Sequence, residues 1–348
     1  MIRPRRLGLG GLAVALAVTA GNAVTAEGKL SIYHWFEYIP QELLDKFSAE
    51  TGIDVTMDTY DSNEAMLATL KAGKLGSYDV AVPGDYMVEI MIGEGMLDTV
   101  AEGELANIGN VEPQWLDVPF DPGRMHSIPY QWGSTSFSVN RDVYGGDIRT
   151  TGIVFDPPDE LKGRINILDA QGEVMLLASM HLGIPQCSTV REQLKALDEL
   201  LQSAKEHWAS FNSDGAKDVL VSGDAAVGMI WNGFSAKARA EGANIEYSYP
   251  REGLIVWMDN VVLLRDAPNR ENAIMFMDFL LEPENIAAVT NFAQYSAGVM
   301  GVTDLLDDAL KSQPESIPPA DAPSGTFVQV CDQATQEVYD SIWTRLKK

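Results

Sequence analysis

The sequence predicts an α/β protein of two lobes, each with a mainly parallel sheet flanked by helices. Segments with the two-residue period of a β-strand alternate with segments of helical period over the first hundred residues. Regular alternation of this kind builds a parallel sheet with helical crossovers. The chain has 348 residues, whereas one hydrophobic core rarely organises more than about 250 to 300. Two lobes are therefore the expected division.

The first 26 residues have the pattern of a secretory signal. Three arginines precede an uncharged, mostly apolar run to Ala20, and small residues stand before an expected cleavage site ahead of Glu27. The apolar run is shorter than the roughly 20 residues that a membrane span requires, and no later stretch is long enough. We predict that residues 1–26 are a cleaved signal peptide and that the mature protein is soluble and exported.

The chain is strongly acidic. Removing the three arginines of the predicted signal peptide changes the formal net charge from −25 to −28. Nucleic acid and anionic membranes are therefore poor partners, and we expect a monomer that binds no nucleic acid. Because acidic surfaces also serve solubility, the charge permits a cationic ligand without requiring one.

Strand and helix signals alternate regularly from residue 29 to residue 95. The strands alternate apolar and polar side chains, and the helices keep apolar residues at helical spacing. Asp61 and Glu64 have the spacing of a capping box, and Gly52 ends the first helix. The predicted strands are 29–33, 54–60 and 78–82, and the predicted helices are 40–51, 61–70 and 86–95.

The chain is predicted to pass between the lobes twice. Residues 100–129 are turn-rich and lead into an alternating strand at 136–140, and residues 258–264 carry the chain back. The predicted lobes are therefore 27–135 plus 259–303, and 136–258 plus 304–348. Further strands are predicted at 164–168, 224–231, 246–249 and 253–257. Further helices are predicted at 169–181, 192–207, 214–221, 269–281, 285–295 and 335–347, and one more follows the strand 224–231 and ends at residue 240.

Two stretches combine aromatic rings with a carboxylate. They are Tyr33-His34-Trp35-Phe36-Glu37-Tyr38 and Val256-Trp257-Met258-Asp259. An aromatic face attracts a cation, and a carboxylate adds a charge-assisted hydrogen bond. The first stretch follows a predicted strand, and residues past the carboxyl ends of parallel strands line the ligand crevice. The sequence therefore predicts a box for an organic ammonium ion.

The sequence contains no recognisable catalytic or metal-binding motif. Its four histidines stand singly, and no nucleophile elbow or phosphate loop is present. We expect no enzyme activity, no catalytic residue, no metal and no cofactor. Cys187 and Cys331 are the only cysteines; in an oxidising compartment they can pair, but the sequence leaves that open.

Four short motifs stand in order along the chain: Tyr33-x-Trp35-x-Glu37-Tyr38-Ile39, Val82-Pro83-x-x-Tyr86, Gly228-Met229-x-Trp231-Asn232-Gly233 and Trp257-Met258-Asp259. In combination they resemble the spermidine/putrescine-binding proteins of bacterial polyamine transporters, over essentially the whole mature chain. The resemblance implies a type II-like periplasmic-binding-protein fold with a ligand cleft between the lobes. It also implies a periplasmic protein whose partners are a polyamine ligand and an inner-membrane ABC permease.

The resemblance also implies particular ligand-binding residues. The rings that would enclose the ligand are Trp35, Tyr38, Tyr86, Trp231, Trp257 and Tyr295. The acids that would bind its amines are Asp259, Glu173 and Glu37. Phe36, Gly84 and Asp85 depart from the family pattern and bear on which polyamine fits, with Phe36 and Asp85 as additional candidate contacts. The spacing from Asp169 to Glu173 is similar to that of putrescine-type members, which favours putrescine slightly over spermidine.

Three alternatives stay open. The same scaffold suits another cationic amine or an amino-acid-like solute. A sensor that reports ligand occupancy to a membrane receptor would use the same closing lobes. An exported hydrolase is a remote alternative, because it would need an acid–base or nucleophile pair in the cleft.

Overall fold

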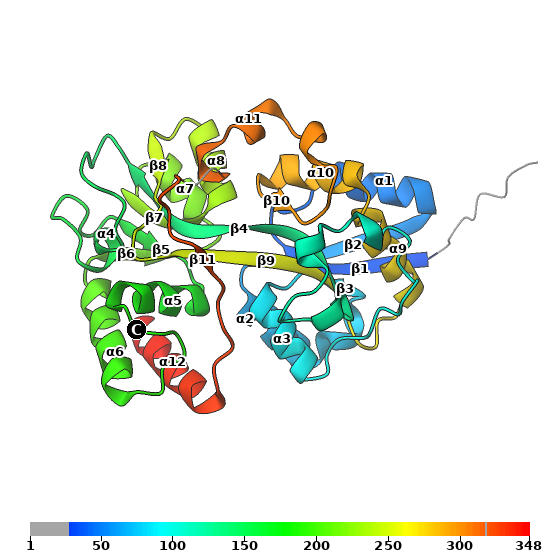
Figure 1. Cartoon of the computed structure of the whole chain (residues 1–348), viewed down its shortest axis with the longest axis horizontal. Helices are drawn as coiled ribbons and strands as arrows, with labels where there is room; N and C mark the ends of the chain where they lie inside the picture. The colour runs from blue at the N-terminus through cyan, green and yellow to red at the C-terminus, as the bar shows by residue number, and fades with distance from the viewer. Residues whose placement is uncertain (1–27, 317–318) are drawn as a thin grey trace, which may run out of the picture.

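The computed structural model describes residues 28–316 and 319–348, so the predicted signal peptide lies outside the described residues. The described strands form one continuous mixed sheet of eleven strands. Figure 1 shows the helices gathered into two groups, one at each end of this sheet. No helix among the described residues is both long and apolar enough to cross a bilayer.

The first end of the sheet has the predicted alternation of strands and helices. Its strands are β1 (Gly28–Trp35), β2 (Ile53–Tyr60) and β3 (Val80–Ala81), and its crossovers contain α1 (Gln41–Thr51), α2 (Asn63–Thr69) and α3 (Asp85–Gly93). Strand β1 pairs in parallel with both β2 and β3. The predicted cap of α2 is wrong by one residue, because Ser62, not Asp61, accepts the hydrogen bond from the backbone N–H of Ala65.

Two long strands connect the two ends of the sheet. Strands β4 (Ser127–Asn140) and β9 (Leu254–Leu263) pair antiparallel and run between the two helical groups (Figure 1). The sequence predicted only parts of them as strand. Most of their side chains are buried on both faces, so the alternation that marks a half-exposed strand is missing. Two of the predicted lobe boundaries, 135/136 and 258/259, fall inside these two strands, and the third, 303/304, falls in the 3-10 turn Thr303–Leu305.

The second end of the sheet repeats the parallel arrangement. Its strands are β5 (Ile165–Ile167), β6 (Trp208–Phe211), β7 (Val227–Trp231) and β8 (Ile245–Tyr247), and its helices are α4 (Gly152–Phe155), α5 (Gln171–Leu182), α6 (Arg191–Lys205), α7 (Ala216–Val221) and α8 (Asn232–Ala240). Strand β5 pairs in parallel with β6 and β7, and β7 pairs antiparallel with β4. Strand β6 and the short α4 were not predicted.

The C-terminal part contributes to both ends. Its elements are α9 (Arg270–Leu280), α10 (Pro283–Ala293), β10 (Ser296–Ala297), α11 (Asp308–Lys311), β11 (Gly325–Thr326) and α12 (Gln333–Leu346). Helices α9 and α10 cover the first end, and α12 packs beside α5 and α6 at the second (Figure 1). Asn269, which the sequence predicts as the capping residue of the helix 269–281, makes no side-chain cap to α9; its side-chain amide donates to Asp79.

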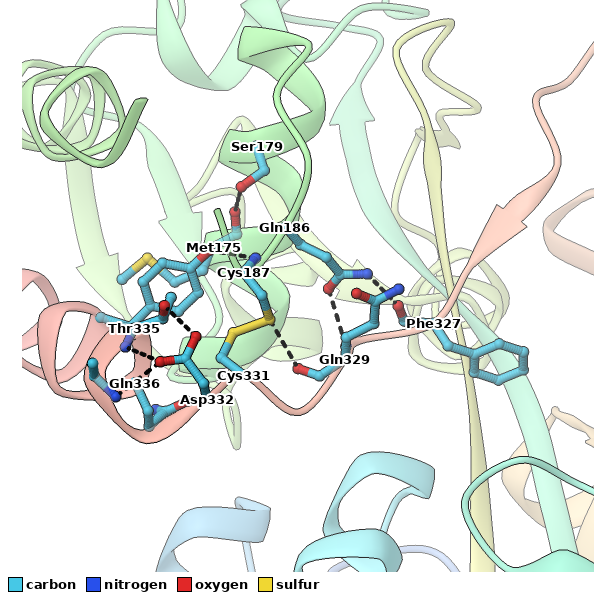
Figure 2. The surroundings of a disulfide bond; sticks show 12 residues. Met175, Ser179, Gln186, Cys187, Phe327, Gln329, Cys331, Asp332, Thr335 and Gln336 are labelled. Carbon is cyan, nitrogen blue, oxygen red and sulfur yellow. Dashed lines mark hydrogen bonds between the residues drawn. A yellow bond between two sulfur atoms is a disulfide. The ribbon is translucent and has the colours of Figure 1, made fainter. Parts of the chain in front are cut away.

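The central order of the sheet is β2-β1-β3-β9-β4-β7-β5-β6, with β8 and β10 on β4 and β11 on β9. The turn-rich connections contain 3-10 turns at Ile108–Asn110, Pro113–Trp115, Pro122–Arg124, Thr303–Leu305 and Pro314–Ser316, and an irregular helical stretch, Leu70–Lys74 and Leu75–Ser77, follows α2. A disulfide between Cys187 and Cys331 joins the loop after α5 to the segment before α12 (Figure 2).

Candidate ligand-binding site

The candidate site is a pocket lined from both ends of the sheet. The first end supplies the residues that follow β1, β2 and β3, and the second end supplies residues from α5 and from the end of β7. Carboxyl ends of parallel strands meet at one edge of a sheet, which brings these remote segments together. The lining residues are Trp35, Phe36, Tyr38, Asp61, Ser62, Asn63, Glu64, Gly84, Asp85, Tyr86, Ala170, Glu173, Trp231, Phe234, Trp257, Asp259, Tyr295 and Val328.

Aromatic rings from the two ends meet in the pocket. The ring centroids of Trp35 and Trp231 are 6.2 Å apart at an interplanar angle of 68°. Trp257 and Tyr295 form a similar edge-to-face pair at 5.0 Å and 73°. The indole N–H of Trp35 donates to the carbonyl oxygen of Val82 at 2.7 Å, which fixes the orientation of the ring. The pocket is thus walled by rings in preferred packing geometries.

Asp259 supplies a buried carboxylate beside these rings. The phenol of Tyr38 donates to Oδ2 of Asp259 at 2.8 Å. Burial raises the pKa of Asp259 well above its usual value; the Tyr38 hydrogen bond opposes this shift, and the nearby carboxyls of Asp85 and Glu173 add to it. The ionised form of Asp259 therefore needs a positive partner.

Glu173 has one carboxylate oxygen without a partner. It lies in the first turn of α5, where Thr135 Oγ1 donates to Oε1 at 2.9 Å. Oε2 is buried and accepts no hydrogen bond. Burial raises the pKa of Glu173 to about 7. A buried acceptor left without a donor costs free energy, so Oε2 is suited to receive a donor from a ligand.

Asp85 uses both carboxylate oxygens for backbone contacts. Oδ1 accepts from the N–H of Tyr86 at 2.7 Å, and Oδ2 accepts from the N–H of Met258 at 2.8 Å. Burial raises the pKa of Asp85 to about 7. Asp85 therefore connects the start of α3 to β9, immediately before Asp259.

Glu37 does not line the pocket, in contrast to the sequence-based expectation. The turn after β1 gives Glu37 a positive φ of 49° and leaves the residue exposed. Its carbonyl oxygen accepts a hydrogen bond from Lys237 Nζ at 3.4 Å, outside the lining. All other residues predicted to contact the ligand, Phe36 and Asp85 included, do line the pocket.

Sequence reasoning missed the segment after β2. Glu64 lines the pocket and accepts a hydrogen bond from the phenol of Tyr86 at 2.8 Å. Asn63 Oδ1 accepts from the N–H of Gly84 at 3.0 Å, and its amide nitrogen lies 2.9 Å from where a side chain on Gly84 would begin. This segment follows the carboxyl end of β2, and that position could have identified it as part of the site. From the sequence alone, Glu64 was interpreted only as a helix-capping residue.

The electrostatics of the lining are one-sided. Within the described part of the chain it contains no Lys, Arg or His, but it does contain acids: Asp61, Glu64, Asp85, Glu173 and Asp259. Carboxylates that share a partly dry site raise one another's pKa values unless a cation compensates them. No group of three or more His, Cys, Asp or Glu among residues 28–316 and 319–348 has the arrangement of a metal site. The geometry suits an organic cation with an apolar body.

Comparisons with known proteins identify the family of the chain. The family described as bacterial extracellular solute-binding protein matches residues 42–319. The chain is 34% identical to the spermidine/putrescine-binding periplasmic protein of Escherichia coli over 96% of each chain. It is 32% identical to a putrescine-binding periplasmic protein of Pseudomonas aeruginosa over 99% of each chain. A putative spermidine/putrescine ABC transporter structure from Listeria monocytogenes superposes with a TM-score of 0.85 at 29% identity, covering 92% of this chain and 98% of the other.

Proposed function

This chain belongs to the bacterial extracellular solute-binding proteins, and from that premise we propose that it captures a polyamine and delivers it to an ABC-type permease. The observation that carries the proposal is the pocket's lining, in which buried carboxylates stand among aromatic rings with no basic side chain in the described lining. A short alkyl diamine complements both features, because its methylenes suit the rings and its ammonium groups suit the acids.

The ligand's two ammonium groups have two natural partners. Asp259, held by Tyr38, would bind one, and Glu173 with its free Oε2 would bind the other. Two charge-assisted hydrogen bonds and three cation–ring contacts supply roughly 6 to 9 kcal/mol. Micromolar affinity corresponds to about 8 kcal/mol net of the entropic cost of association, so exclusion of water from the pocket has to strengthen these contacts.

Within the polyamines we propose putrescine over spermidine. The spacing from Asp169 to Glu173 supports this choice, and the Pseudomonas aeruginosa relative is named for putrescine alone, whereas the Escherichia coli relative is named for both amines. Phe36 and Asp85 both line the pocket. Phe36 has no polar group, and Asp85 already accepts a backbone hydrogen bond, so neither residue provides an additional polar contact for a third amine.

The mode of action we propose is closure of two lobes. Residues 27–135 plus 259–303 would move as one body and residues 136–258 plus 304–348 as the other, about the paired strands β4 and β9. A monomer would act in the periplasm after removal of residues 1–26, in keeping with the periplasmic relatives. Closure would present the loaded form to the permease in the inner membrane.

A thermal-shift panel tests the proposal. Putrescine, cadaverine, spermidine, spermine and agmatine are compared with neutral and amino-acid solutes, since a ligand stabilises the folded state by mass action. We expect the diamines to raise the unfolding temperature most. Stabilisation only by an amino-acid-like solute would support the alternative ligand class, and no shift with any amine at millimolar concentration would contradict the proposal.

A further inference from the structure

The segment Gly325–Cys331, here called the strap, crosses the pocket wall and is fixed at three points. At one end, β11 pairs in parallel with residues 254–255 of β9. In the middle, the side-chain amide of Gln186 donates to the carbonyl oxygen of Phe327 at 2.9 Å and accepts from the N–H of Gln329 at 3.0 Å. At the other end, the disulfide joins Cys331 to Cys187, next to Gln186 (Figure 2).

Val328, between the two clamped residues, lines both the ligand pocket and a second cavity, here called the outer cavity. The hydrogen-bonded pair Tyr86 and Glu64 lines both spaces as well. The second cavity lies between helices α2 and α3 on one side and α5 and α12 on the other, and its lining is rich in amides and acids. Those polar residues include Gln171, Gln186, Gln329, Gln333, Gln336, Glu337 and Asp340, and the lining also contains Lys71, whose Nζ pairs with Glu94 at 2.6 Å.

The side chain of Val328 has little freedom to withdraw. A side chain built on Gly172, in the first turn of α5, would begin 3.1 Å from Val328 Cγ1, so the valine packs against that helix. Its backbone neighbours are held by Gln186. Val328 also offers no side-chain acceptor, so it cannot pair with an ammonium group. Val328 is thus the apolar member of the three residues that stand between the acidic pocket and the outer cavity; the other two, Glu64 and Tyr86, are hydrogen-bonded to each other.

We propose that Val328 sets the length of the ligand, by closing the pocket to chains longer than a short α,ω-diamine such as putrescine or cadaverine. Gln186 and the Cys187–Cys331 disulfide are positioning residues that hold Val328 in place. The inference rests on the proposed polyamine function and adds a specificity determinant to it. A smaller residue at position 328 would open a path along which a longer amine reaches the polar outer cavity.

A series of unbranched diamines, from diaminopropane to diaminooctane, tests the proposal by calorimetry. The wild type should bind a short diamine best, with affinity falling for longer chains. Val328→Ala should change the ratio of the dissociation constants for diaminooctane and putrescine by about tenfold or more in favour of the longer chain, the scale of methylene discrimination in pockets. Val330→Ala is the matched control, because Val330 is exposed on the same strap and lines only the outer cavity.

Removal of the disulfide tests the positioning role separately. The doubly substituted Cys187→Ser, Cys331→Ser protein, shown to be folded by its melting curve, should shift the same ratio towards that of Val328→Ala. The proposal would be overturned if affinity depended on diamine length in the same way in Val328→Ala and the wild type. It would also be overturned if Val330→Ala changed the ratio of dissociation constants as much as Val328→Ala does. An unchanged ratio without the disulfide would overturn the positioning role. Absence of any diamine binding by the wild type would instead contradict the proposed function.

Discussion

The phenol of Tyr38 donates a 2.8 Å hydrogen bond to Oδ2 of Asp259, 221 positions later in the chain. Tyr38 follows β1 and Asp259 lies in β9, so this bond joins the two stretches in which the sequence combines rings with acids. The bond orients a buried carboxylate among aromatic rings, and ligand binding is expected to depend on that carboxylate.

Asp259→Asn should weaken putrescine binding by more than about tenfold, because a desolvated ammonium group would lose its charged partner. Calorimetry on the purified mature protein measures the change, and circular dichroism checks that the fold is intact. Asp159→Asn is the control, since Asp159 is an almost fully exposed acid outside the pocket. Equal affinities for Asp259→Asn and the wild type would mean that the site is misplaced.

Ligand binding should release protons near neutral pH. Burial raises the pKa of Glu173 to about 7, so this acid is partly protonated in the free protein near neutral pH, and burial raises the pKa of Asp259 as well, whereas a bound cation favours the ionised forms of both. Affinity should therefore fall as the pH falls below about 7. Calorimetry in two buffers of different ionisation enthalpy detects the released protons, and a binding enthalpy that is independent of the buffer would refute this linkage.

The stability of the ligand-free protein should change with pH in the corresponding direction. Glu173 and Asp85, with pKa values of about 7, bind more protons when folded than when unfolded. Their contribution to stability is therefore present at low pH and is lost as the pH rises from about 4.5 through about 7. The ligand should thus raise the melting temperature more at about pH 8 than at about pH 5. An equal ligand effect at both pH values would contradict this expectation.

Trp257→Ala should weaken binding about as much as Asp259→Asn, because it removes a ring that pairs edge-to-face with Tyr295. Trp257→Phe keeps a ring and should retain most of the affinity. Fluorescence titration follows binding, because Trp35 and Trp231 remain in the pocket as reporters. Trp343→Phe, on α12 and outside the pocket lining, controls for general loss of signal. Wild-type affinity in Trp257→Ala would show that the Trp257 ring does not contribute to ligand binding.

Asp85→Ala should lower the free energy of unfolding by about 1 to 3 kcal/mol, because the buried N–H of Met258 loses its acceptor. Asp85→Asn retains an acceptor oxygen and should cost less. Urea denaturation of both variants gives the comparison. If the two variants were equally stable, the bond from Asp85 to Met258 would not be the stabilising contact.

The sequence predicted the first end of the sheet well, because each strand and helix there carries its own local period. Strands β4 and β9 were predicted only in part, since burial on both faces removes that period. The acids Glu173 and Asp259 and the pocket rings other than Phe234 were predicted through the family resemblance, whereas Phe234, in α8, was missed. The sequence could not show that Glu37 lies outside the pocket lining, unlike the residues beside it, because the positive φ of Glu37 in the turn after β1 decides its exposure.

Glu64 and Val328 show why the remaining lining could not be predicted. Glu64 reaches the site through a hydrogen bond to Tyr86, which depends on how α2 and α3 pack. Val328 lines the pocket because Gln186 and the disulfide hold the strap in place. Both depend on contacts between segments far apart in the sequence, and neither leaves a local pattern.

The most direct test of the central claim is a calorimetric titration of the mature protein with putrescine at neutral pH, alongside Asp259→Asn. The account predicts saturable binding at one site with micromolar or tighter affinity, and its loss or strong weakening in the variant. No saturable binding to the wild type, or binding that Asp259→Asn leaves intact, would contradict a polyamine site built on this carboxylate.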